Sequence, residues 1–316
     1  MGKLQRYFWP KTALLFFIEN EEIHGAFGYL EKGGIDVAER RSVPFARRSE
    51  FEAWYEELRR TYPRTYTAAM LDTYNQGALP GCGASVLQTF GVDAALVHTL
   101  CVDGRWSAYV SLVEMKWFEQ KFKGIELDLL FSPFVLLYEK SRKFLDETPG
   151  LFLLHQKGVA YLMVLSLDRM WYAQVVIASE SGTEEPAMEE EDEELSFDLE
   201  MLGDEEEDEV APISDVDILG KFKEGDEASA EGDETALEQL EYNLNLFEEV
   251  KEAINRFYRD ERYPQTFIEK VTVFDADELG GDFVRYVEDE LFMEATLHRF
   301  DPIETMASLV PQEVGK

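Results

Sequence analysis

The sequence has few cysteines and few basic residues, and each shortage excludes a class of protein. Two cysteines, Cys82 and Cys101, in 316 residues cannot form the disulfide framework of a small secreted domain. Because they also lack CxxC spacing, we expect two free thiols in a reducing compartment, with Cys101 a small apolar residue of a strand. Lysine and arginine number 30 against 65 acidic residues, a formal net charge of -35. Nucleic acid is therefore not an expected partner, because binding phosphates requires basic residues.

Long apolar runs are also missing. The longest run, residues 129–138, is interrupted by Pro133 and is shorter than the roughly 18 to 20 residues that cross a bilayer. The first 17 residues, MGKLQRYFWPKTALLFF, lack the small-residue cleavage site of a signal peptide. We therefore expect a soluble, cytoplasmic chain.

What the sequence does contain is a long acidic segment. Residues 180–236 hold 25 carboxylates and two lysines, which leaves too little apolar surface for folding, so we expect a disordered insertion over 181–234. Two apolar islands, SFDLEML (196–202) and VDILGKF (216–222), are candidate partner-binding segments, although the segment is equally compatible with a solubilising linker. The residues expected to bind are Phe197, Leu199, Met201, Leu202, Ile218, Leu219 and Phe222.

The rest of the chain contains the same pattern twice. Residues 13–45 and 151–179 each predict three consecutive strands, with turns at Asn20-Glu21 and Lys157-Gly158. Each trio is eventually followed by an amphipathic helix and a further strand. The helices are expected at 49–62, with Ser49 as N-cap, and at 235–259.

Smaller elements complete the plan. Residues 76–83 predict a loop, and residues 84–124 predict a small inserted unit of two strands and two helices. Further expected elements are a helix over 132–144, a strand over 267–274, a helix over 281–291, a strand over 295–299, and a last helix begun by Asp301 and stopped by Pro311.

This order of elements resembles the actin-like ATPase fold, and more specifically the PilM family and the cytoplasmic domain of the type II secretion protein GspL. The resemblance is carried by both strand trios, by VHTLCVDGRWSAYVSLVEMKWFEQKFKGIELDLLFSP, and by FIEKVTVFDADELGGDFVRYVEDELFMEATLHRFDP. The ending SLVPQEVGK is loosely similar to the short Leu-Pro-containing motif that precedes or docks onto the membrane-anchored part of these machines.

The resemblance implies an α/β, two-lobed (ribonuclease H-like) fold with a small inserted subdomain and a disordered acidic insertion. The expected domains are lobe I at 1–83, the subdomain at 84–130, lobe II at 131–180 and 235–300, the insertion at 181–234, and a C-terminal helix and tail at 301–316.

The resemblance also implies a function. Such a protein is a non-catalytic scaffold at the cytoplasmic face of the inner membrane, in a type II secretion, type IV pilus or DNA-uptake machine. Its implied partners are the assembly ATPase and PilN/PilO-like or GspM-like membrane proteins. Membrane contact would come through them or through an anchor following Lys316, and self-association is left open. An active ATP-binding protein and an acidic adaptor of another envelope machine, such as a flagellar motor, are the alternatives.

A nucleotide site of this fold is expected to be degenerate. Actin-like ATPases hold phosphates on glycine-rich turns, because backbone amides must approach an anion closely and carboxylates repel it. Here the turn at Glu19-Asn20-Glu21-Glu22 is acidic, the turn at Lys157-Gly158 lacks Asp-x-Gly, and the loop after the late strand has three acids before its glycines. We therefore expect no cofactor and no ATP hydrolysis; Mg²⁺ or Ca²⁺ on Asp275, Asp277 and Glu278 is a minor alternative. The degenerate cleft residues are Glu19, Asn20, Glu21, Lys157, Gly158, Asp275, Asp277, Gly280 and Gly281.

No catalytic motif stands elsewhere in the chain. The four histidines, among them His155, lie in or next to expected strands without HExxH spacing, and we interpret them as structural. Arginines cluster between positions 40 and 64, and pairing with nearby glutamates on the helix surface is the favoured interpretation. An anionic partner is the alternative, at Arg40, Arg41, Arg47 and Arg48.

Overall fold

The protein was analysed as a computed structural model. It describes residues 10–156, 158–178, 230–263, 266–277 and 279–314. The chain divides into two compact units, one of residues 1–179 and 242–316 and the other of residues 180–241. In the second unit the described residues are 230–241, the first turns of helix α6 (Ala230–Arg259). Both apolar islands of the acidic segment lie outside the described residues.

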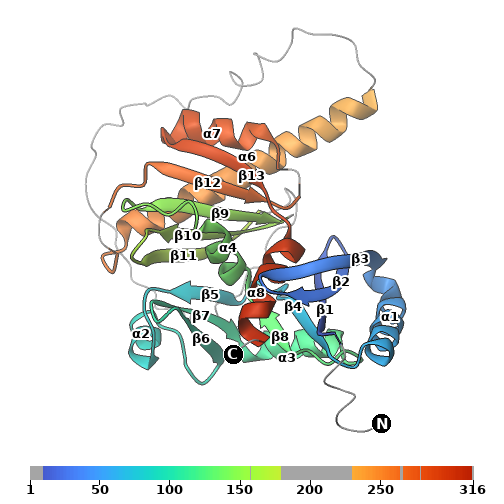
Figure 1. The fold of residues 1–316 in the computed structure, drawn as a ribbon. Helices are drawn as coiled ribbons and strands as arrows, with labels where there is room; N and C mark the ends of the chain where they lie inside the picture. Colours follow the sequence, from blue (N-terminus) through green and yellow to red (C-terminus); the bar gives the residue numbers. More distant parts are fainter. Residues whose placement is uncertain (1–9, 157, 179–229, 264–265, 278, 315–316) are drawn as a thin grey trace, which may run out of the picture. The chain divides into compact units, whose positions relative to one another are not determined.

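Two five-stranded sheets with the same plan form the first unit (Figure 1). Each contains an antiparallel trio of strands that continues into two parallel strands, and the prediction of two trios is confirmed. The first sheet has the order β3 (Gly34–Pro44), β2 (Glu22–Glu31), β1 (Thr12–Glu19), β4 (Thr65–Met70), β8 (Leu129–Phe131). The second has the order β11 (Met170–Ile177), β10 (Val159–Leu165), β9 (Gly150–Gln156), β12 (Lys270–Asp275), β13 (Glu294–Arg299).

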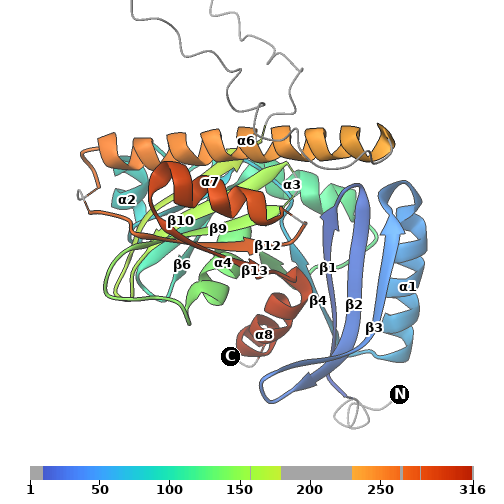
Figure 2. The same cartoon turned by 90° about the horizontal axis from the view of Figure 1, so that it is seen from above.

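Helices cover both faces of each sheet because the strands are apolar on both sides. Alternate residues of β1 separate two cores: Leu14 and Phe16 pack with α1 (Arg48–Thr61), whereas Leu15 packs in a core shared with the second sheet. That shared core contains α4 (Pro133–Ser141) and α8 (Pro302–Val314), and Figure 2 shows α8 between the sheets. The far face of the second sheet is covered by α6 from residue 246 on and by α7 (Gly281–Leu291).

A small three-stranded sheet has the order β5 (Gln76–Leu79), β7 (Trp106–Ser111), β6 (Val97–Val102) and carries α2 (Ala84–Thr89) and α3 (Leu112–Lys121). The prediction of a loop over 76–83 was therefore wrong in its first half. Gln76–Leu79 has no alternating pattern of its own, and β7 supplies its ladder partners.

The two cysteines form a disulfide, which overturns the prediction of two free thiols. Ser107 in the central strand pairs with Leu79 on one side and with Cys101 on the other, so the loop after β5 carries Cys82 across to β6. Cys101 is exposed on the edge strand and is not a core residue. Because the two cysteines are paired, they do not indicate a reducing compartment.

Two helix boundaries also differ from the prediction. Helix α1 begins at Arg48 after a short 3-10 helix, Phe45–Arg47, so Ser49 is inside the helix and is not its N-cap. Helix α8 runs through Pro311 to Val314. A proline removes one amide donor, and the buried Leu309 and Val310 hold the last turn in place. Asp301 caps α8 as predicted, accepting from the Ile303 and Glu304 amides.

Candidate functional site: the cleft loops

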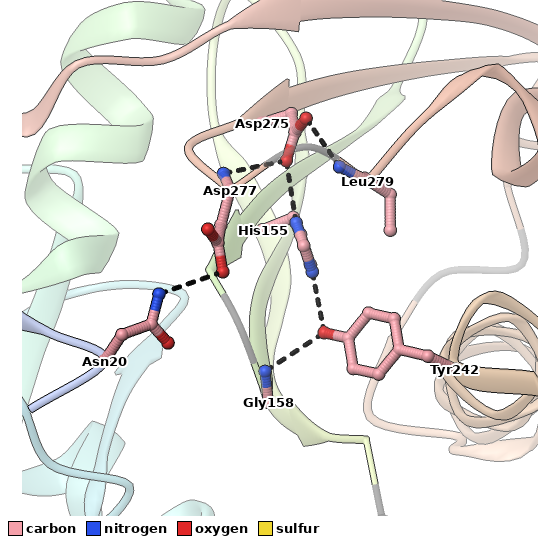
Figure 3. A network of polar contacts seen from close by, with 7 residues as sticks. All are labelled: Asn20, His155, Gly158, Tyr242, Asp275, Asp277 and Leu279. Carbon is pink, nitrogen blue, oxygen red and sulfur yellow. Dashed lines mark hydrogen bonds and ion pairs between the residues drawn. The ribbon is translucent and has the colours of Figure 1, made fainter. Parts of the chain in front are cut away.

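Three loops meet where the two sheets face each other. They are the β1–β2 turn, the β9–β10 turn and the loop after β12 (Figure 3). Strands β9 and β12 are parallel neighbours, so their carboxyl ends lie side by side. In the β1–β2 turn, Asn20 and Glu21 have φ of 49° and 58°, the left-handed conformation required by two-residue hairpin turns. Gly158 takes the same region, with φ of 79°.

A chain of hydrogen bonds runs through these loops. His155, 1% exposed, places Nδ1 2.7 Å from Asp275 Oδ1 and Nε2 2.7 Å from the Tyr242 hydroxyl. The Gly158 amide donates to the same hydroxyl over 3.0 Å. Tyr242 comes from α6, so the network joins three segments that are far apart in the sequence (Figure 3).

A neutral histidine satisfies every bond in this chain. An ionised Asp275 only accepts, so His155 donates from Nδ1 and its Nε2 is left as an acceptor. The Tyr242 hydroxyl donates to Nε2, and its oxygen accepts from the Gly158 amide. Burial raises the pKa of Tyr242 to about 12, which keeps the hydroxyl proton available for the bond to His155.

Asp275 also closes the loop that follows β12. Its carboxylate accepts from the Asp277 amide at 3.2 Å and from the Leu279 amide at 2.9 Å. Burial acts to raise the pKa of Asp275, but the bonds from His155 and from the two amides outweigh it and hold the pKa below its ordinary value. Asp275 is therefore an ionised acceptor at neutral pH.

Glu19 gives the opposite side of the cleft an acidic character. Burial, followed by the charge of Asp277, raises the pKa of Glu19 from an ordinary 4.5 to about 7; Asp275 and Asp301 add to the rise, and a hydrogen bond to Gln156 opposes it. Next to Glu19, Asn20 Nδ2 donates to Asp277 Oδ2 at 3.4 Å, which links the two sheets' loops. The carboxyl groups of Glu19 and Asp277 therefore lie close enough to influence each other across these loops.

The described loops of the second sheet do not fit the phosphates of a nucleoside triphosphate. A phosphate on this fold needs free backbone amides at the turns, and here the amides of Gly158, Asp277 and Leu279 already donate to side chains of the chain itself. The surrounding carboxylates would repel an anion. No step of chemistry through a nucleotide follows from this geometry.

Of the predicted cleft residues, the structure brings Glu19, Asn20, Gly158, Asp275 and Asp277 together. Gly280 and Gly281 begin α7, one residue beyond Leu279. Lys157 and Glu278 lie outside the described residues. The sequence reasoning missed Tyr242, which sits 87 residues from His155 in a helix pattern that gave no signal for it.

The predicted basic residues do not form one free surface. Arg40 pairs with Asp301 at 2.8 Å, and Arg41 pairs with Glu39 at 2.6 Å. Arg47 pairs with Glu50 at 3.2 Å, and the Arg48 guanidinium lies 5.7 Å from the Phe45 ring centroid. Three of the four arginines therefore have an acidic partner, but none of these partners is Glu52, Glu56 or Glu57, and Asp301 is distant from Arg40 in the sequence.

The two matching sheets and the cleft between their turns define the actin-like ATPase fold. The chain belongs to the family described as "Domain of unknown function (DUF8341)", whose model matches residues 151–315, just over half of the chain. A second model, "Domain of unknown function (DUF8569)", matches residues 9–138. No curated protein matches the chain.

Among solved structures, the chain is similar to the PilM-PilN type IV pilus biogenesis complex, at 13% identity over 93% of this chain and 89% of that chain, with a TM-score of 0.52. A Bacteroides thetaiotaomicron protein of unknown function with an actin-like ATPase fold is similar over 98% of each chain, at 8% identity and a TM-score of 0.46. The ethanolamine utilization protein EutJ from Carboxydothermus hydrogenoformans is similar at 12% identity over 95% of this chain and 87% of that chain, with a TM-score of 0.40. No helix among the described residues is long and apolar enough to cross a membrane.

Proposed function

We propose that this protein is a non-catalytic actin-like scaffold in which the cleft has a structural role and binds no nucleotide. One observation carries the proposal: the amides that would hold a phosphate donate instead to Tyr242 and Asp275. These bonds hold the β9–β10 turn and the loop after β12 in one arrangement with α6, and the Asn20–Asp277 bond at 3.4 Å links them to the β1–β2 turn. A fixed set of loops suits a protein that presents surfaces.

The machine in which it works is proposed from the fold. The PilM-PilN structure is a complex of a type IV pilus system, and the likeness supports a pilus or type II secretion machine with a PilN-like or GspM-like membrane partner. The assembly ATPase is a further proposed partner, and the proposed location is the cytoplasmic face of the inner membrane. An adaptor role in another envelope machine is the alternative that shares the same surfaces.

A second candidate function is ATP binding in the same cleft. It is favoured by the glycines that remain there, since Gly158 and Gly280 keep positive φ values of 79° and 81°, the backbone conformation suited to a turn around an anion. In that case the Tyr242 hydroxyl would have to leave the Gly158 amide when the nucleotide arrives.

Thermal unfolding with Mg-ATP separates the two candidates. A ligand at 100 times its dissociation constant stabilises the folded state by about 2.7 kcal/mol, which is a shift of several degrees for a chain of this size. We expect no shift for the wild-type chain at millimolar Mg-ATP, with Mg²⁺ alone as the control. A nucleotide-dependent shift would overturn the proposal that the cleft binds no nucleotide, whereas copurification with a secretion or pilus ATPase would identify the machine.

A further inference from the structure

Two phenylalanines are exposed at the same end of the second sheet. Phe267 is 84% exposed and Phe292 is 89% exposed. Phe267 precedes β12 by three residues and Phe292 precedes β13 by two, and these strands are parallel neighbours that pair from Lys270↔Glu294 onward. The Glu294 amide donates to the Glu269 carbonyl at 3.0 Å. The segments that lead into β12 and β13 are therefore hydrogen-bonded to each other where the two strands begin.

Phe292 combines an exposed side chain with an unfavourable backbone conformation. It is the residue that ends α7 and has φ of 54° and ψ of 35°, a left-handed conformation that glycine or asparagine adopts easily and a bulky residue does not. Its neighbour Met293 is buried. A strained conformation that leaves an aromatic ring in water does nothing for packing, and such outliers concentrate at binding sites.

Phe267 is presented in a similar way. The next residue, Ile268, is buried, and its amide donates to the Tyr258 hydroxyl at 3.0 Å. The Phe267 ring centroid is 6.2 Å from that of Tyr258. The backbone next to the exposed ring is therefore fixed to α6, so the ring projects from an anchored segment.

The charges that flank this pair in the sequence are mostly negative. The exposed acidic residues that flank the two phenylalanines in the sequence have no ion-pair partner among the residues that the structure describes, and Lys270 is exposed beside them. The acidic residues are Glu269, Glu288, Asp289, Glu290 and Glu294. A partner that buries the phenylalanines must offset this charge, which excludes an acidic segment and favours Lys and Arg.

We infer that Phe267 and Phe292, with the flanking carboxylates, form a docking surface for a short peptide segment of a partner protein in which lysine or arginine alternates with apolar side chains. Cytoplasmic ends of membrane proteins carry an excess of Lys and Arg next to apolar residues. The chemistry of the segment rests on this surface alone, whereas its origin in a membrane protein rests on the proposed function.

The test uses the full chain and three synthetic 12-residue peptides, measured by fluorescence anisotropy at 150 mM salt. The first contains lysine and leucine, the second has serine in place of each leucine, and the third has glutamate in place of each lysine. The serine peptide reports the attraction that any basic peptide has for so acidic a chain. We expect the lysine–leucine peptide to bind at least tenfold more tightly than the serine peptide, and more weakly in 1 M salt because salt screens the charges.

Variants then locate the surface. Phe267→Ser with Phe292→Asn should abolish the tenfold preference for the apolar peptide, and Phe292→Asn should not lower the melting temperature because asparagine accepts the left-handed conformation. Leu167→Ser is the matched control, since Leu167 is 56% exposed in the β10–β11 turn; it should leave the preference unchanged.

Other outcomes overturn the inference. Equal binding of the leucine and serine peptides, tighter binding of the glutamate peptide, or retention of the preference in the double variant would each refute the docking surface. A dimer in sedimentation that the double variant dissociates would assign the surface to a second copy of this chain. None of these results would change the Mg-ATP experiment, so the surface and the proposed function can fail independently.

Discussion

Replacing Glu19 with glutamine should stabilise the protein in a way that depends on pH. In the folded chain, burial and the charge of Asp277 raise the pKa of Glu19 from 4.5 to about 7. Between these two pH values the folded state therefore holds more of the proton than the unfolded state does, and stability falls as pH rises through the window. Glu19→Gln keeps the shape of the side chain but cannot ionise.

The magnitude follows from the same values. At 1.36 kcal/mol per pKa unit, the interval between 4.5 and about 7 sets an upper limit of about 3.4 kcal/mol. Solvent reaches part of this side chain, so screening reduces the expected gain to about 1 to 2 kcal/mol above pH 7. The gain should shrink to about 0.4 kcal/mol at pH 4.5, where the wild-type carboxyl is protonated in the folded state and half ionised in the unfolded state.

Urea unfolding of the wild-type and Glu19→Gln chains at pH 8 and at pH 4.5 measures this difference. Glu57→Gln, an exposed glutamate on α1, is the matched control and should change stability by less than about 0.5 kcal/mol at either pH. The reasoning would be refuted by a stabilisation of equal size at both pH values, because then the effect would not come from the ionised carboxylate.

Two further predictions concern the network and the disulfide. Tyr242→Phe removes the donor to the buried His155 Nε2 and should lower the free energy of unfolding in urea by about 1 to 3 kcal/mol. The control is Tyr138→Phe, which removes a hydroxyl that donates to the exposed carboxylate of Asp103 and should lower it by less than about 1 kcal/mol. Equal losses would contradict the network's role. Reducing the disulfide opens the loop that it closes in the unfolded chain. For a separation of 19 residues, the loss should destabilise the small sheet by about 3 kcal/mol. Hydrogen exchange in β6 that does not change with dithiothreitol would contradict this.

The sheets could be predicted from the sequence because their signals are local. Apolar strands of seven to ten residues, separated by Asn20-Glu21 and by a glycine turn at Gly158, specify antiparallel trios without any distant contact. The helices after them follow from apolar residues at helical spacing. The order of these elements was then sufficient to indicate the actin-like fold.

What could not be predicted depends on contacts between distant segments. β5 is a strand because β7 lies beside it, and Cys82 reaches Cys101 only once that small sheet has formed. His155 was interpreted as structural, and its partners could not be identified from the sequence because they are 87 and 120 residues away. The acidic residues of the turns are visible in the sequence. Which side chains accept hydrogen bonds from the backbone amides depends on the tertiary structure.

The hydrogen-bond network around His155 indicates a structural role for the glycines that remain in the cleft. A phosphate arriving there would have to displace Tyr242 from the Gly158 amide and Asp275 from the amides of Asp277 and Leu279. Displacement would leave the buried His155 without one partner and the partly buried Asp275 carboxylate without its two amide donors, at a cost of about 1 to 3 kcal/mol for each group. Each 1.4 kcal/mol weakens binding tenfold, so the same contacts that join the loops oppose a nucleotide. The glycines then serve the turns, because a residue at φ of 79° is needed to pass the chain from β9 to β10 whether or not an anion binds.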